Sequence, residues 1–290
     1  MSIASEITRI QNAKTALKTS INAKTDSQHK ITNETIDDYS NFVDSITGGG
    51  EHTGAYKVES VAEMNAITDM ETGDYCIVED ASSLPNEYQE VEYLESNGTQ
   101  YIDTNYAPYK TQSEIKFQTP TKPSTNCHTM GCWNENNNRY YVCSYANDYF
   151  NTADRQGNAT VLSSWNNNIH TVIYNNENNK VLYDGVQKAS VSDLTTQTTG
   201  HIYLFARYNG TTATEYYHGR IYYLKITDKN ANTLVRHLIP CVRKSDSVAG
   251  MYDIVNNVFY TNIGTGTFIT GEEIINYTVY KYNGTSWVEA

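Results

Sequence analysis

The feature that most constrains the fold is a succession of short segments, between residues 84 and 270, that read as strands with one buried face. Tyr141, Cys143 and Tyr145 form one such segment, and we expect these three alternate residues to share a face. Turn signals such as Asp184-Gly185 separate the segments at short intervals, and no long helical pattern interrupts them. The pattern predicts two antiparallel sheets packed as a jelly-roll β-sandwich.

The first 24 residues follow a different period. Apolar residues there are spaced by four, three, seven and four, which is a heptad pattern with Lys14 at the missing core position. An isolated helix of this length is marginal in water, and isoleucine at both core positions favours three strands over two. We therefore predict a homotrimeric coiled coil, and the alternative is an amphipathic helix packed on its own domain. The oligomerisation residues would be Ile3, Ile7, Ile10, Leu17 and Ile21.

Two further segments complete the predicted organisation. Residues 32–46 have helical apolar spacing, and the three glycines 48–50 end this region, so residues 1–50 are expected to be a helical stem. Residues 51–82 and 274–290 each contain strand patterns, but neither is large enough to bury a core alone. We expect them to pair as one small α+β module, with the sandwich, residues 83–273, inserted between them. The predicted fold class is thus mainly β with an α-helical N-terminus.

Charge and hydropathy exclude several classes of function. The net charge is −12, with 33 acidic and 21 basic residues, which argues against binding to nucleic acid phosphates. No run approaches the ~20 apolar residues that a membrane-spanning helix needs, so membrane insertion is not expected. The first 13 residues contain charges and no long apolar stretch, which predicts synthesis in a cytoplasm without an export signal.

The metal-ligating residue types do not form a recognisable site. The five cysteines are an odd number and do not describe a disulfide framework. Cys127, His128, Cys132 and Cys143 are close in sequence, but they lack the paired C-x2-C spacing of zinc sites, so buried free thiols are the favoured interpretation. The sequence indicates no cofactor. Calcium is not indicated either, because the candidate ligands Asp103, Asp184 and Asp253 are scattered along the chain.

Three segments of the predicted sandwich carry a family resemblance. They read LPNEYQEVEYLESNGTQYIDT from residue 84, GRIYYLKITD from residue 219 and GMYDIVNNVFYTNIGTGTF from residue 250. They resemble the concanavalin-like, laminin-G-like domains of tail and fibre proteins from phages and prophages of gut bacteria. The resemblance implies a jelly roll whose first and last strands meet, in a family that binds sugars or proteins.

The flanking segments have a related resemblance. VESVAEMNAITDMETGDYCIV, from residue 58, and VYKYNGTSWVE, from residue 279, look like parts of one continuous small module of phage tail proteins. ITNETIDDYSNFVDSI, from residue 31, resembles the N-termini of phage tail and fibre proteins. This implies that a sandwich has been inserted into a loop of the small module.

Candidate carbohydrate-binding residues come from aromatic side chains beside polar loops. Trp133, Tyr140 and Tyr141 flank an asparagine-rich turn, and Trp165 precedes three asparagines. Aromatic rings stack on sugar faces and amides bind hydroxyls, although packing in the core is the alternative for each ring. No nucleophile elbow, phosphate loop or metalloprotease motif is present, so no catalytic residues are predicted. Glu90 and Glu92, which alternation would place on one face of a strand, leave a polysaccharide depolymerase as an alternative.

The resemblance and the stem together predict a non-enzymatic phage fibre or receptor-binding protein on the exterior of the virion. Its stem would hold a homotrimer and dock to other virion proteins, and its lectin-like sandwich would bind a host surface polysaccharide. The alternative is a structural head-fibre, collar or decoration protein, whose sandwich merely protrudes.

Overall fold

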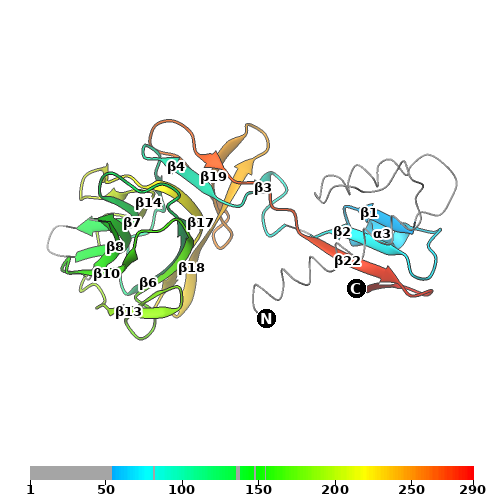
Figure 1. The fold of residues 1–290 in the computed structure, drawn as a ribbon, viewed down its shortest axis with the longest axis horizontal. Helices are drawn as coiled ribbons and strands as arrows, with labels where there is room; N and C mark the ends of the chain where they lie inside the picture. The colour runs from blue at the N-terminus through cyan, green and yellow to red at the C-terminus, as the bar shows by residue number, and fades with distance from the viewer. Residues whose placement is uncertain (1–53, 81, 135–137, 147, 154) are drawn as a thin grey trace. The chain divides into compact units, whose positions relative to one another are not determined.

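A computed structural model of the chain describes residues 54–80, 82–134, 138–146, 148–153 and 155–290. The predicted stem, with its heptad residues from Ile3 to Ile21, lies outside the described residues and stays a prediction. The fold is mainly β, with sheets arranged as a sandwich. The chain divides into two compact units, and it passes from one to the other between residues 80 and 81 and between residues 276 and 277 (Figure 1).

The small unit is a four-stranded sheet with one short helix. Its elements are β1 (Ala55–Val58), α3 (Val61–Ala66), β2 (Tyr75–Glu79), β22 (Tyr277–Tyr282) and β23 (Trp287–Glu289), and the strand order is β1-β2-β22-β23. β1 and β2 are parallel, whereas β2 and β22 are antiparallel, with Glu79 opposite Tyr277. The two halves of this unit are therefore hydrogen-bonded neighbours, and the whole sandwich is inserted between two paired residues.

Local capping and a small apolar core hold α3 on this sheet. The hydroxyl of Ser60 accepts a hydrogen bond from the backbone N–H of Glu63 at 3.2 Å, and the Glu63 carboxylate accepts one from the N–H of Glu59 at 2.9 Å. Such reciprocal bonds satisfy N–H groups at the start of a helix. Met64 is then placed against the buried strand residues, while Trp287 packs at the margin of the same core.

The large unit contains two sheets that face each other as layers, with β7, β8 and β10 in one and β6, β17 and β18 in the other (Figure 1). Within the described residues, the eight-stranded sheet consists of β5 (Ile102–Asp103), β7 (Cys127–Asn134), β8 (Asn138–Ala146), β9 (Tyr149–Ala153), β10 (Ala159–Ser164), β14 (Tyr203–Leu204), β15 (Arg207–Tyr208) and β16 (Ala213–Thr214). The eleven-stranded sheet consists of β3 (Tyr88–Glu90), β4 (Leu94–Asn97), β6 (Thr111–Gln118), β11 (Ile169–Tyr174), β12 (Lys180–Tyr183), β13 (Val186–Ser190), β17 (His218–Asp228), β18 (Thr233–Arg243), β19 (Val248–Asp253), β20 (Val258–Thr261) and β21 (Ile269–Thr270). β4 pairs with β21, so the first and last parts of the sandwich meet.

The core between the two sheets is unusually rich in tyrosine, and each buried hydroxyl has a partner. Tyr140 bonds the hydroxyl of Ser113 at 2.8 Å, and Tyr217 bonds that of Thr119 at 2.8 Å. Tyr174 donates to the carbonyl of residue 153 at 2.9 Å. Because a buried hydroxyl without a hydrogen bond is costly, these bonds explain how the three tyrosines are compatible with a packed interior.

The cysteines lie in the buried cores of the two units. All five are free and buried, as the sequence interpretation favoured. Burial raises the pKa of Cys127 and of Cys132 to about 12, which makes their thiols inert at neutral pH. Among the helices that the structure describes, none combines the length and the apolar character needed to span a membrane.

Candidate functional site

The candidate site lies on the outer face of β7 and β8, in the eight-stranded sheet. Gly131 is opposite Tyr141 in this antiparallel pair, and Trp133 is opposite Arg139. Tyr140, between two of these residues, points into the core between the sheets. Since successive side chains on a strand alternate between faces, the other four lie on the face that points away from the core.

This alternation corrects one of the residues predicted to bind carbohydrate. Tyr140 is 1% exposed and its hydroxyl is bonded inside the core, so its ring cannot stack on a ligand. Tyr141 is on the outer face, but it is also largely covered, at 6% exposed. Trp133 is partly exposed on the same face. The sequence prediction grouped two adjacent tyrosines of one strand, and adjacent residues of a regular stretch of strand face opposite sides of the sheet.

The fourth predicted residue is not part of this group. Trp165 follows the last residue of β10, its ring packs against the core, and its backbone N–H donates to the carbonyl of Asp148 at 2.9 Å. Its indole N–H is buried without a partner among the described residues. Trp165 is therefore placed as a packing residue.

A charged network covers the outer face beside Tyr141. The carboxylate of Glu215 lies 2.7 Å from Nε2 of His128 and 3.3 Å from Nη2 of Arg207. Nη1 of Arg207 donates to the hydroxyl of Tyr141 at 3.0 Å. The backbone N–H of His128 also donates to the carbonyl of Glu215, at 3.0 Å. Glu215 thus fixes the side chains of both a histidine and an arginine.

The guanidinium groups lie over the aromatic rings. Cζ of Arg207 is 5.1 Å from the ring of Trp133 and 5.4 Å from that of Tyr141, and Cζ of Arg139 is 5.0 Å from Trp133. These are cation–π distances. Gly131 leaves room for this arrangement, because a Cβ there would lie 3.1 Å from the Tyr141 ring and 3.5 Å from Cγ of Arg207. The absence of a side chain lets the ring and the arginine stem cross the strand closely.

The backbone beneath the network is strained. Glu215 has φ 51° and Phe205 has φ 61°, in the left-handed region that side chains rarely adopt. Among the described residues, most of the other non-glycine residues with a positive φ are asparagine or aspartate, which tolerate this conformation. Such strain persists only where surrounding contacts fix it, and it clusters at functional sites. With this backbone conformation, both the carboxylate and the backbone carbonyl of Glu215 contact His128.

The protonation states follow from burial. Burial lowers the pKa of His128 below its ordinary value, more than the neighbouring Glu215 carboxylate raises it, so the imidazole is neutral at pH 7. The hydrogen bond with His128, together with the charge of Arg207, lowers the pKa of Glu215. A neutral His128 that donates from Nε2 leaves Nδ1 as an acceptor, and Nδ1 has no partner among the described residues.

A group of tyrosines continues the face beyond Gly131. Tyr203 is opposite both Gly131 and Asp103 in the sheet. The ring of Tyr101 lies 5.1 Å from that of Tyr203 and 6.0 Å from that of Tyr216, and all three tyrosines are partly exposed. Tyr216 directly follows Glu215, so the tyrosine group (Tyr101, Tyr203 and Tyr216) adjoins the charged network.

Sequence reasoning missed most of this site. Arg207 and Glu215 are far from Trp133 in the chain, and only the pairing of β15 with β7 brings them together. His128 was considered only as a zinc ligand. No local motif around Glu215 indicates its left-handed backbone, so no sequence signal was available for it.

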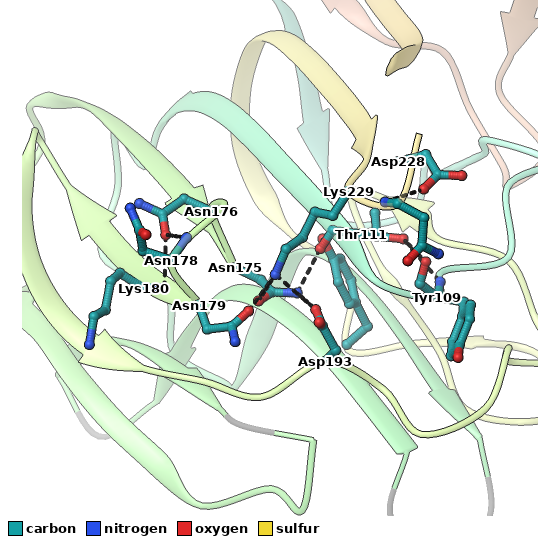
Figure 2. Close-up of polar contacts among 12 residues, drawn as sticks. Tyr109, Thr111, Asn175, Asn176, Asn178, Asn179, Lys180, Asp193, Asp228 and Lys229 are labelled. Carbon is teal, nitrogen blue, oxygen red and sulfur yellow. Dashed lines mark hydrogen bonds and ion pairs between the residues drawn. The ribbon is translucent and has the colours of Figure 1, made fainter. Parts of the chain in front are cut away.

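A second polar cluster, formed by side-chain oxygens, is filled by a lysine. Figure 2 shows the Lys229 side chain reaching Asn175, Asn179 and Asp193. Nζ lies 2.9 Å from the side-chain oxygens of Asn175 and Asp193. Asn175 also donates to the carbonyl of Thr111 at 2.9 Å. The ammonium occupies the centre of these oxygens, so the cluster ties loops together.

The three aspartates considered for calcium are each bound to protein donors. Asp103 contacts His201 at 3.0 Å, Asp184 contacts His170 at 2.7 Å, and Asp253 accepts from the N–H of residue 237 at 3.0 Å. In the described part of the chain, no group of three or more His, Cys, Asp or Glu residues could hold a metal ion.

Comparisons with known proteins add little to this geometry. No protein-family model and no curated protein matches the chain. Among solved structures, it is similar to a protein from Bacteroides ovatus described as a "putative carbohydrate binding protein", with 13% identity over 76% of this chain and 72% of that one, and a TM-score of 0.43. At this identity and score, function must be argued from the chain's own residues.

Proposed function

We propose that this chain is a carbohydrate-binding adhesin of a bacteriophage virion, which attaches to a host surface polysaccharide through the outer face of its eight-stranded sheet. The observation that carries the proposal is the combination of partly exposed aromatic rings with a fixed network of charged hydrogen-bonding groups on that face. Trp133 and the tyrosine group supply the rings, and Arg207 and Glu215 supply the network.

Sugar chemistry fits these groups. A pyranose presents an apolar C–H face and a rim of hydroxyls, so it needs flat apolar surfaces beside placed donors and acceptors. The ion pair of Arg207 and Glu215 holds its atoms in position before a ligand arrives, which reduces the entropy lost on binding. The tyrosine group offers several rings in a row, which suits an extended saccharide.

The virion part of the proposal rests on the sequence. The segments from residues 31, 84, 219 and 250 resemble those of phage tail and fibre proteins. A trimeric stem would present three weak sites together, and linked sites bind far more tightly than single ones. The stem would also be the part that docks to other virion proteins.

We propose binding without catalysis. Glycoside hydrolysis needs two carboxyl groups roughly 5–10 Å apart that are free to act as acid, base or nucleophile. On this face, Glu215 is held by His128 and Arg207, and Asp103 is held by His201. Glu90, considered earlier for a depolymerase, lies in β3 of the other sheet.

The test is binding of the full chain to host polysaccharides and to an array of defined saccharides. Trp133→Ala is expected to weaken binding about tenfold or more, because it removes a ring of the site. Tyr75→Ala is the matched control, since it removes an exposed ring from the small unit. If no saccharide binds, the structural head-fibre, collar or decoration role replaces the adhesin. Release of reducing ends from a bound polysaccharide would instead establish a depolymerase.

The stem is tested separately by light scattering coupled to size exclusion. The full chain is expected to be a trimer, and a chain starting at Glu51 is expected to be a monomer. Two monomers would refute the coiled coil, and two trimers would place the oligomer contact in the sandwich or the small unit.

A further inference from the structure

Most arginines of the sandwich form an ion pair with a carboxylate, but in the described part of the chain two do not. Four of the six form an ion pair with a carboxylate within the described residues: Arg207–Glu215, Arg220–Glu95, Arg236–Asp253 and Arg243–Asp246. Arg139 and Arg155 have no carboxylate partner in that part of the chain. Arg139 belongs to the candidate site, because its guanidinium lies 5.0 Å from the Trp133 ring.

Two guanidinium groups share one aromatic ring at this site. Those of Arg139 and Arg207 both lie within 5.1 Å of the Trp133 ring. Two like charges beside one ring repel each other, and within the described residues only Arg207 has a carboxylate beside it. The chain as a whole carries 33 acidic against 21 basic residues, so a locally unpaired positive charge is not a consequence of its composition.

The hydrogen-bonding groups show the same imbalance. The Glu215 carboxylate already contacts the side chains of both His128 and Arg207. The Nε atoms of Arg139 and of Arg207 are buried without a partner among the described residues. Positive charge is therefore in surplus at this site, because Arg139 has no carboxylate beside it among the described residues, and a bound group with negative charge would complement it. Guanidinium groups bind carboxylate, sulfate and phosphate in a bidentate geometry.

We propose that the saccharide bound by this face is acidic, and that Arg139, with Arg207 beside it, binds its anionic substituent. This inference rests on the proposed carbohydrate function and narrows it to one class of ligand. Trp133 holds both guanidinium groups in place, so the ring positions the charges as well as contacting the sugar. Carboxylate and sulfate sugars share this chemistry, and the saccharide panel separates them.

The experiment measures the Kd of the full chain for matched pairs of oligosaccharides by titration calorimetry. Each pair has the same backbone, with uronic acid carboxyl groups in one member and reduced carboxyl groups in the other; sulfated and unsulfated pairs form a second series. Arg139→Gln is expected to weaken binding of the acidic member about tenfold or more, since hydrogen bonds to a charged group are the strong ones. Binding of the neutral member should change less than about twofold. Arg139→Lys, which keeps the charge, should recover part of the loss.

Arg243→Gln is the matched control, because it removes an arginine whose partner is Asp246, outside the site. Glu135 and Asp154 lie outside the described residues. A carboxylate that neutralised Arg139 would compete with an anionic ligand, so the effect of these two charges is tested by replacement. The variant Glu135→Gln with Asp154→Asn should bind the acidic saccharide at least as well as the parent chain. Weaker binding by that variant would overturn the inference.

The remaining outcomes separate the two proposals. Equal binding of acidic and neutral members, unchanged in a folded Arg139→Gln variant, overturns the acidic ligand and leaves the carbohydrate function standing. No binding to any saccharide overturns the carbohydrate function and this inference with it. Circular dichroism and thermal unfolding of each variant exclude a loss of fold as the cause of weaker binding.

Discussion

Replacing Lys229 with methionine should destabilise the sandwich substantially. The methionine keeps the length of the side chain but removes the ammonium that contacts Asn175, Asn179 and Asp193. The side chain of Lys229 is 12% exposed and that of Asp193 is 28% exposed. Removing one partner of a fully buried ion pair costs roughly 3–5 kcal/mol, and partial screening of Asp193 by solvent reduces this to about 2 kcal/mol.

The expected change is measurable by calorimetry and by urea unfolding. For a domain of this size, about 2 kcal/mol lowers Tm by roughly 4–8 °C. Lys188→Met is the matched control, since Lys188 is exposed on β13, and its Tm should remain within about 1 °C of the parent. Equal Tm values for the two variants would refute the view that Lys229 ties the loops together.

The effect should also depend on pH. Burial alone would raise the pKa of Asp193, but hydrogen bonds from Asn175 and Lys229 bring it below its ordinary value. A carboxylate with a lowered pKa contributes stability above its unfolded pKa, near 3.9, and loses it as pH falls through the folded pKa. The stability difference between the parent chain and Lys229→Met should therefore be constant near pH 7 and shrink below about pH 4. A difference that grows in acid would contradict the ion pair.

Three further predictions follow from buried groups. Tyr140→Phe should lower the free energy of unfolding by about 1–2 kcal/mol, measured with urea, because it removes the hydrogen bond to Ser113. Saccharide binding should be unchanged, and loss of binding in a folded variant would contradict the core position of the ring. The five cysteines should resist iodoacetamide at pH 8 and react after unfolding, and labelling of the native protein, measured by mass spectrometry, would show an accessible thiol. Burial lowers the pKa of both His128 and His237, so the unfolded state takes up protons first and stability should fall as pH drops below about 6.5; equal urea midpoints at pH 7.5 and pH 5.5 would argue against this.

Apolar alternation was enough to predict the sandwich, because it depends only on which residues face the core. It was not enough to predict faces along β8. Tyr141, Cys143 and Tyr145 were expected to share a face, but Cys143 and Tyr145 belong to the core while Tyr141 lies outside. A register shift between Tyr141 and Ser144 separates them. One extra residue in a strand inverts the face of those that follow, and no residue type marks it reliably.

The site was harder to predict than the fold because its charged groups come from distant segments. Trp133 was identified from its neighbours in sequence, whereas Arg207 and Glu215 reach it through the parallel pairing of β15 with β7. A strand of two residues, such as β15, leaves no periodic signal. Single residues beside turns can therefore be nominated from sequence, but the groups that orient them cannot.

The order of strands in the small unit determines how it would carry a mechanical load. The chain enters this sheet at Ala55, beside Tyr75, and leaves toward the sandwich at Glu79, opposite Tyr277. Tension between the N-terminal side and a sandwich anchored to a surface would pull β1 and β2 along their axes in opposite directions. The hydrogen bonds between these parallel strands would then be loaded together in shear rather than opened one after another. Because both Asp80 and Tyr277 connect to the sandwich, the force would also divide between β2 and β22, which are hydrogen-bonded neighbours.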